Sequence, residues 1–349
     1  RKVPKDIFKK EFQDELIWLT YKKLPEDKQT ELLVKLDDPE VLKDYKVRLN
    51  KELTEALKLK GETQALKQIS LYTSMGTVCR LLAQAREAKK WHKDALRKVE
   101  HVTNKEPYYA LAYQNLGLTY DLQGKFHESI PHYKKSLEIK LKLLGENHKD
   151  ILFLYNKIGN AFGKKGEYNE ALSYLTKSLE GYIKLVGHKH PSVAGCYSDL
   201  SNVHLAMGNY EKAKDYTTFS LAIRFKVYGE SPAIVPCYND FAKIYAAQNN
   251  YTQASEYYLK VIGIYERSYG LEHPILGLGY CNLGIATKHL GELEQAHDYF
   301  QKALELQKAG YGLEHHHVAI TLENIGILYK DQGNYTEALS HYEQSLEMR

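Results

Sequence analysis

A period of 41 or 42 residues runs through most of this 349-residue chain and limits its fold more than any other feature. A turn residue marks the period, and it is glycine in every unit but one: Gly124, Gly166, Gly208, Asn249, Gly291 and Gly333. A second set of glycines closes the units at the same interval: Gly145, Gly187, Gly229, Gly270 and Gly312. A repeat of this length indicates one supersecondary unit that is copied and stacked on its neighbours.

The pattern within a unit predicts a pair of helices. Tyr113, Leu116 and Tyr120 form the stripe of large residues at i, i+3 and i+7 that marks a first helix. Gly124 is predicted to turn the chain at positive φ, and a second helix then runs from about Phe126 to Leu144. We expect its inner stripe to consist of Ser129, Tyr133, Ser136 and Leu137. Such a hairpin has an apolar face that only stacking can bury.

The residues within the repeat resemble a known family. The tetratricopeptide repeat typically has a bulky residue, Leu and Gly in its first helix, and Ala, an aromatic residue and Ala in its second. This chain has the same pattern at Tyr280, Leu283, Gly284, Ala296, Phe300 and Ala303. The longer period and the Gly-x-x-His-Pro connectors at 187–191 and 270–274 resemble the kinesin light chain subgroup. This resemblance implies an all-α fold, a right-handed α-solenoid of stacked helix-turn-helix units. No light-chain-like heptad coiled coil is evident near Leu32–Leu42, which argues against a motor light chain.

The repeat also divides the chain into three parts. Six units of about 42 residues occupy 107–349. Residues 63–106 are interpreted as a degenerate first helix pair, because Gly76 lies 41 residues before Gly117 and Trp91 lies 42 before Tyr133. Residues 1–62 are predicted to be a charged helical segment that caps the array, with helices near 5–22, 26–37 and 40–59.

Composition excludes several classes of protein. The net charge of +4 is too small to predict nucleic-acid binding, and the longest apolar run, at 151–155, is far too short to insert into a membrane. Four cysteines without a closely spaced pair favour a reduced, cytoplasmic compartment. Of the 29 tyrosines, 26 fall in 107–349, and nine of these recur at two packing positions. One position is Tyr113, Tyr155, Tyr197, Tyr238 and Tyr280, and the other is Tyr168, Tyr210, Tyr251 and Tyr335.

No catalytic motif is present, so we expect no enzyme activity and no cofactor. His148, His190, His273 and His315 recur once per connector, but stacked units lie on the order of 20 Å apart, so these side chains are predicted to cap helices rather than share a metal. His315, His316 and His317 are close enough to bind a metal weakly, but extended neighbours point to alternate faces, so no metal site is expected. Cys196 and Cys237 are expected to be buried small apolar residues.

Binding in the resembled family takes place in a concave groove lined by the first helix of each pair. Each first helix carries a small residue at the repeat position of Gly117. The residue two positions before it and the residue one position after it lie on the same helix face. The candidate groove residues, called the candidate set below, are Asn115, Lys157, Asn160, Lys164, Asn202, Lys243, Asn282 and Asn324. An amide can donate and accept hydrogen bonds from a bound peptide backbone, although it can equally bond the adjacent repeat. The lysines and amides partly resemble a carboxylate clamp, but Asp199 and Asp240 intrude, which disfavours a chaperone C-terminus reader.

These observations predict a protein-interaction scaffold whose partner is a protein or peptide. The alternative is a sensor module of a larger signalling NTPase, and a third interpretation is an enzyme-regulating array of the bacterial phosphatase type. The chain starts without Met and stops within a helical pattern, so we expect it to be part of a larger chain or complex.

Overall fold

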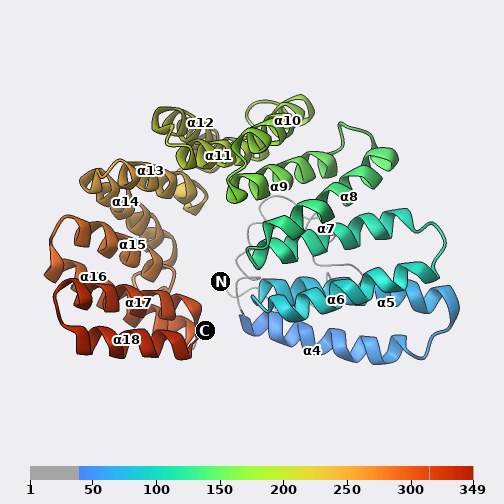
Figure 1. The fold of residues 1–349 in the computed structure, drawn as a ribbon, viewed down its shortest axis with the longest axis horizontal. Coiled ribbons are helices and arrows are strands. Elements are labelled where there is room, and N and C mark those ends of the chain that lie inside the picture. The colour runs from blue at the N-terminus through green and yellow to red at the C-terminus, as the bar shows by residue number, and fades with distance from the viewer. Residues whose placement is uncertain (1–38, 314, 349) are drawn as a thin grey trace. The chain divides into compact units, whose positions relative to one another are not determined.

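The computed structural model describes residues 39–313 and 315–348, and the regular elements in this part of the chain are all helical. The helices predicted near 5–22 and 26–37 lie outside it. The chain divides into two compact units, of which the first ends at Gly181 and the second begins at Tyr182. Figure 1 shows that the helices of each unit follow one another in chain order. Each unit is therefore described separately.

The first helix of this unit in the described residues is α4 (Pro39–Ala56), in the place of the helix predicted at 40–59. Its other elements are α5 (Gly61–Leu81), α6 (Ala85–Lys98), the 3-10 helix η1 (Val99–His101), α7 (Glu106–Leu122), α8 (Phe126–Leu144), α9 (Lys149–Lys165) and most of α10 (Tyr168–Val186). Helix α5 packs on α6 and α7 packs on α8, and α5 also contacts α7. The predicted bounds of α8 are confirmed, as is the burial of its inner stripe.

The second unit has the same construction. Its elements are α11 (Pro191–Ala206), α12 (Tyr210–Tyr228), the 3-10 helix η2 (Pro232–Ile234), α13 (Val235–Ala247), α14 (Tyr251–Tyr269), α15 (Leu276–His289), α16 (Leu293–Tyr311), α17 (His316–Asp331) and α18 (Tyr335–Glu347). The first helices of successive pairs touch, α11 on α13 and α15 on α17. The predicted all-α solenoid of stacked helix pairs is thus confirmed within each unit.

The turn between the two helices of a pair requires the left-handed backbone region. Gly124 has φ +67°, as predicted, and Asn249 adopts φ +59° in the same role. Asparagine tolerates this region better than most residues with a side chain. The residue at this turn position is therefore selected for its ability to adopt positive φ, which asparagine shares with glycine.

A small residue on the first helix of a pair packs against the side chain sixteen positions later on the second. A Cβ atom added to Gly117 would lie 2.5 Å from the ring of Tyr133, and one added to Gly284 would lie 2.7 Å from that of Phe300. The same spacing relates Gly159 to Leu175, Gly326 to Tyr342, and Ser201 to Thr217, whose hydroxyls hydrogen bond at 2.7 Å. This small-to-large contact sets how closely the two helices approach.

The first helix pair, α5 and α6, follows the same spacing with a different residue from the one predicted. Gly76 faces His92, at 2.3 Å from an added Cβ, so the counterpart of Tyr133 is His92 and not Trp91. Trp91 instead lies beside Tyr72, with ring centroids 5.5 Å apart. The contact supports the proposal that residues 63–106 are a degenerate first repeat.

Ring contacts explain the first tyrosine position. In most pairs, a ring on the second helix contacts a ring of the first helix nineteen or twelve residues earlier. The nineteen-residue contacts have centroid distances of 5.5 to 6.1 Å and join Tyr72–Trp91, Tyr113–His132, Tyr155–Tyr174, Tyr197–Tyr216, Tyr238–Tyr257 and Tyr280–Tyr299. The twelve-residue contacts include Phe162–Tyr174 at 5.7 Å and Tyr245–Tyr257 at 5.6 Å. We call this row of rings the aromatic seam.

At Tyr251, the second tyrosine position packs on the following repeat. The ring of Tyr251 stacks on His289 at 4.4 Å, at the end of the next pair's first helix. Tyr335 on α18 is 71% exposed, and no helix follows α18 in the described residues. Stacking of the next pair is therefore what covers this position.

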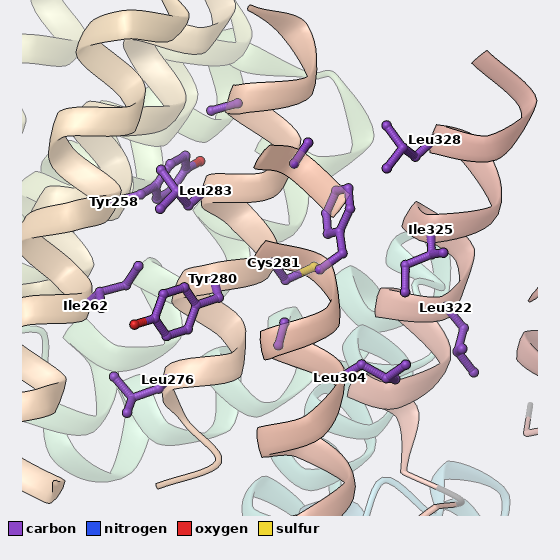
Figure 2. Packing of buried hydrophobic residues seen from close by; sticks show 14 of the residues in the cluster. Tyr258, Ile262, Leu276, Tyr280, Cys281, Leu283, Leu304, Leu322, Ile325 and Leu328 are labelled. Carbon is purple, nitrogen blue, oxygen red and sulfur yellow. The ribbon is translucent and has the colours of Figure 1, made fainter. Parts of the chain in front are cut away.

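Apolar side chains of successive helices form continuous cores. In the second unit, one cluster joins Tyr258 and Ile262 of α14, Leu283 of α15, Leu304 of α16 and Ile325 of α17 (Figure 2). This core thus crosses from one helix pair to the next.

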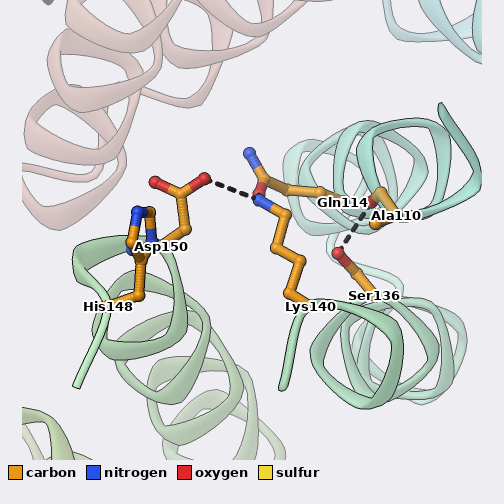
Figure 3. A network of polar contacts seen from close by, with 6 residues as sticks. All are labelled: Ala110, Gln114, Ser136, Lys140, His148 and Asp150. Carbon is orange, nitrogen blue, oxygen red and sulfur yellow. Dashed lines mark hydrogen bonds and ion pairs between the residues drawn. The ribbon is translucent and has the colours of Figure 1, made fainter. Parts of the chain in front are cut away.

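A buried polar network links successive pairs in the first unit. Lys140 of α8 is 8% exposed and donates to Gln114 of α7 at 2.8 Å and to Asp150 of α9 at 3.0 Å (Figure 3). Lys140 therefore connects its own helix pair with the next one.

Two glycine-to-alanine substitutions test the small-to-large contact. Gly284→Ala should lower the free energy of unfolding by about 1–3 kcal/mol, because the methyl group would overlap the Phe300 ring. Gly195→Ala on α11 meets no atom within 4 Å and should raise it by about 0.5–1 kcal/mol, through helix propensity. Denaturant unfolding measures both, and equal stability of the two variants would contradict the packing.

His92 makes stability depend on pH. It is fully buried and neither ring nitrogen has a hydrogen-bond partner in the described residues. Burial, with a smaller effect of Arg80, lowers its pKa to about 3. Between about pH 6.5 and 3 the unfolded chain binds a proton that the folded chain does not, so stability is lost as the pH falls through this window. We expect a loss of about 2 kcal/mol at pH 5 relative to pH 7.

The matched variant is His92→Leu, which copies the Leu175 found opposite Gly159. It should remove this part of the pH dependence, as measured by unfolding at pH 5 and pH 7. An unchanged slope in the variant would assign the acid sensitivity to other groups.

Candidate functional site

The candidate set lies on the first helices of the repeats. Lys164, Asn202 and Lys243 are exposed, while Lys157, Asn160, Asn282 and Asn324 are half-buried. Asn115 on α7 is only 7% exposed and therefore offers little surface to a partner. Asn202 on α11 and Lys243 on α13 occupy the same register position on two helices that contact each other.

The lysines of the first unit lie over aromatic rings. The ammonium of Lys157 is 5.3 Å from the ring centre of Phe153, and that of Lys164 is 5.5 Å from the ring of Phe126 on α8. Such cation–π contacts hold a lysine in place without neutralising its charge. Beside them, Asn160 donates to the side-chain oxygen of Asn156 at 3.1 Å. This part of α9 therefore presents positive charge.

The second unit places a carboxyl group among the same positions. Asp240 on α13 is 6% exposed, and its carboxylate lies 3.6 Å from the ammonium of Lys243. Desolvation raises the pKa of Asp240 to about 6, an effect that Lys243 and Arg224 oppose and Asp199 increases. The sequence identified Asp240 only as an intrusion into a clamp pattern, because burial of a carboxyl on a helix face cannot be read from spacing.

The helices of this part of the second unit carry further polar side chains. Ser198 on α11 hydrogen bonds Ser220 on α12 at 2.9 Å, and Arg224 donates to Ser220 at 3.3 Å. The side-chain oxygen of Asn239 is buried and lacks a hydrogen-bond partner within the described residues. Ser198 and Asn239 were not predicted from the sequence, although they stand one position before the aspartates at 199 and 240.

Asn324 shows the alternative role of the amides. Its side-chain nitrogen donates to the carbonyl of Ile320 at 2.9 Å and lies 3.7 Å from the sulfur of Cys281 on α15. An amide of the candidate set thus contacts the preceding repeat here.

Three of the four connector histidines are helix N-caps, as predicted. The Nδ1 atom of His148 accepts a hydrogen bond from the backbone N–H of Asp150 at 3.2 Å, His190 accepts one from Ser192 at 3.1 Å, and His315 accepts one from His317 at 3.2 Å. Each of these rings occupies the place that Ser or Asn takes in other helices. His273 accepts from Ile275 at 3.2 Å in the turn before α15, whose N-cap residue is Ile275.

The predicted burial of the cysteines is also confirmed. Cys196 is 2% exposed and Cys237 is fully buried, and all four cysteines are free thiols. Burial raises the pKa of Cys79 to about 11 and also raises that of Cys237 and Cys281, which keeps these thiols in their unreactive neutral form.

The repeats define the chain as a protein-interaction scaffold of stacked helix pairs. The family model described as tetratricopeptide repeat matches residues 67–142, 150–224, 237–309 and 278–349, which is more than half of the chain. The chain belongs to the tetratricopeptide repeat family, in the 42-residue form that resembles kinesin light chains. No curated protein sequence matches it.

Solved structures share the fold at low sequence identity. The chain is similar to aspartyl phosphate phosphatase F from Bacillus subtilis, with 15% identity, a TM-score of 0.61, and coverage of 99% of this chain and 86% of that one. It is similar to a Rap protein complexed with competence and sporulation factor, with 18% identity, a TM-score of 0.60 and coverage of 86% and 78%. BtubC (BKLC) from P. vanneervenii is 20% identical over 64% of this chain and 91% of its own, with a TM-score of 0.53.

Among residues 39–313 and 315–348, no helix is long and apolar enough to cross a membrane.

A substitution at His190 tests the imidazole cap. His190→Ala should lower the free energy of unfolding by about 0.5–2 kcal/mol, because the first turn of α11 loses its side-chain acceptor. His190→Asn should recover most of the loss, since asparagine is a good N-cap residue. Denaturant unfolding compares the two, and an equal loss in both variants would show that the ring stabilises the connector by packing.

Proposed function

We propose that this chain binds a protein or peptide partner along the faces of its first helices, in the concave groove expected of stacked tetratricopeptide repeats. The observation that carries the proposal is the exposure of Asn202 and Lys243 at one register position on two contacting helices. Both side chains are exposed, so the amide of Asn202 and the ammonium of Lys243 can reach a partner. The ammonium of Lys243 also pairs with the carboxylate of Asp240 at 3.6 Å.

The exposed amide at this position supports an extended peptide. The side chain of Asn202 can both donate and accept hydrogen bonds. A peptide backbone supplies N–H and C=O groups in alternation, so it can bond this amide without a specific side-chain sequence. The Rap protein complexed with competence and sporulation factor is a fold-level precedent for a bound factor.

The alternative is that binding regulates a larger signalling NTPase, or an enzyme as in the bacterial phosphatase arrays. The likeness to aspartyl phosphate phosphatase F supports a regulatory array at the level of the fold alone. In each case the chain itself binds and does not catalyse. Its free, buried cysteines agree with a reduced, cytoplasmic location. A nucleotide-binding motif elsewhere in the same protein would decide for the NTPase.

The double variant Asn202→Ala with Lys243→Ala tests the groove. Partners captured by the wild-type chain are identified by mass spectrometry, purified and titrated against both proteins. We expect the affinity to fall at least about tenfold, because two polar contacts are removed, with the helical circular dichroism unchanged.

The matched control is Thr218→Ala with Lys226→Ala, which removes a polar residue and a lysine from exposed positions of α12. It should leave the affinity unchanged. Equal affinities of the two double variants would remove the groove from the proposal.

A further inference from the structure

Three histidine rings gather where α16 leads into α17. The ligand nitrogens of His315, His316 and His317 all lie within 4.8 Å of one another. Their ring centroids are 4.4 Å apart for 315 and 316, 5.1 Å for 315 and 317, and 3.9 Å for 316 and 317. The alternation expected of extended neighbours does not hold, because His315 is extended but α17 begins at His316.

The arrangement suits a transition-metal ion. Neutral imidazole is a common ligand of Zn²⁺, Cu²⁺ and Ni²⁺, and three histidines with one water complete a tetrahedral zinc site. A zinc–nitrogen bond of about 2.1 Å sets neighbouring ligand nitrogens about 3.4 Å apart, so the rings need to close by roughly 1 Å. Tyr311, the last residue of α16, stacks on His315 at 4.4 Å and lies 5.8 Å from His317, so it limits the positions of two of the rings.

Metal binding by His315 competes with the hydrogen bond that its ring already accepts. A neutral imidazole has one nitrogen that carries hydrogen and one with a free lone pair. In His315 that lone pair is on Nδ1 and accepts the backbone N–H of His317. If a metal binds Nδ1 it takes this lone pair directly, and if it binds Nε2 the proton must move to Nδ1. Either way the helix cap is lost.

We propose that His315, His316 and His317 together bind one divalent transition-metal ion, and that binding releases the N-cap of α17. The ring of His315 keeps its single hydrogen in either case, on Nε2 when the metal binds Nδ1 and on Nδ1 when the metal binds Nε2. The metal therefore replaces a hydrogen bond at the start of the helix that carries Asn324. This site does not depend on the proposed partner groove.

Titration of the untagged chain with Co²⁺, and displacement by Zn²⁺, tests the site. We expect one Co²⁺ per chain, with a visible absorption band that Zn²⁺ removes. His316→Gln with His317→Gln should abolish the band, because only one of the three ligands remains. The control His188→Gln removes an exposed histidine from the connector before α11 and should leave it unchanged. Absence of the band in the wild-type chain overturns the proposal, as does its persistence in the double variant.

His315→Asn separates capping from metal binding, because asparagine keeps the cap but removes the imidazole. It should weaken Zn²⁺ binding at least about tenfold, as expected for loss of a ligand. In the wild-type chain, Zn²⁺ should speed hydrogen exchange at the backbone amide of His317, and in the variant it should not. Unchanged Zn²⁺ affinity in His315→Asn, or amide exchange that Zn²⁺ does not alter in the wild-type chain, would overturn the competition between metal and cap.

Discussion

The contact between a small residue on one helix and a side chain sixteen positions later on the next is the constraint on which the rest of the structure depends. At Gly117 and Gly284 an added Cβ would lie 2.5 and 2.7 Å from the facing ring, so a larger residue requires a helix to move. Because the spacing recurs, it also fixes the length of the turn and the rotation of the two helices about their axes. The stability of a repeat array is approximately the sum of such pairs and the interfaces between them. A change at this position therefore acts within its own pair and through the neighbour that stacks on it.

The aromatic seam follows from that fixed rotation. With the helices held at one distance, a ring on the second helix reaches two side chains of the first, nineteen and twelve residues earlier. The rings of Tyr155, Tyr197 and Tyr238 remain half-buried, which suits tyrosine better than phenylalanine because its hydroxyl can stay at the water-facing edge. Lysines complete the seam, for example Lys302, whose ammonium lies 4.2 Å from the ring centre of Tyr280. The excess of tyrosine in the sequence is thus largely a consequence of helix packing.

The parts of the fold that depend on local backbone geometry could be predicted from the sequence. The bounds of α8, the positive φ of Gly124 and Asn249, and the histidine caps each arise from a few adjacent residues. The counterpart of Tyr133 in the first pair was predicted wrongly, because Trp91 is the larger residue but His92 faces Gly76. Exposure within the candidate set could not be predicted either. Asn115 and Asn282 share one register position, yet only Asn115 is buried, because burial depends on which side chains neighbouring helices contribute.

The face that carries the candidate set varies in chemistry because the first helices expose some of its positions and bury others. Lys243 is exposed, whereas Asn115 and Asp240 are buried. Lys157 lies over Phe153, and an aromatic ring leaves its charge unneutralised. Lys243 instead faces Asp240, whose pKa is about 6, so its charge is balanced at neutral pH and unbalanced in mild acid. One repeated helix face therefore holds lysines over aromatic rings in the first unit and a lysine beside a buried carboxyl group in the second.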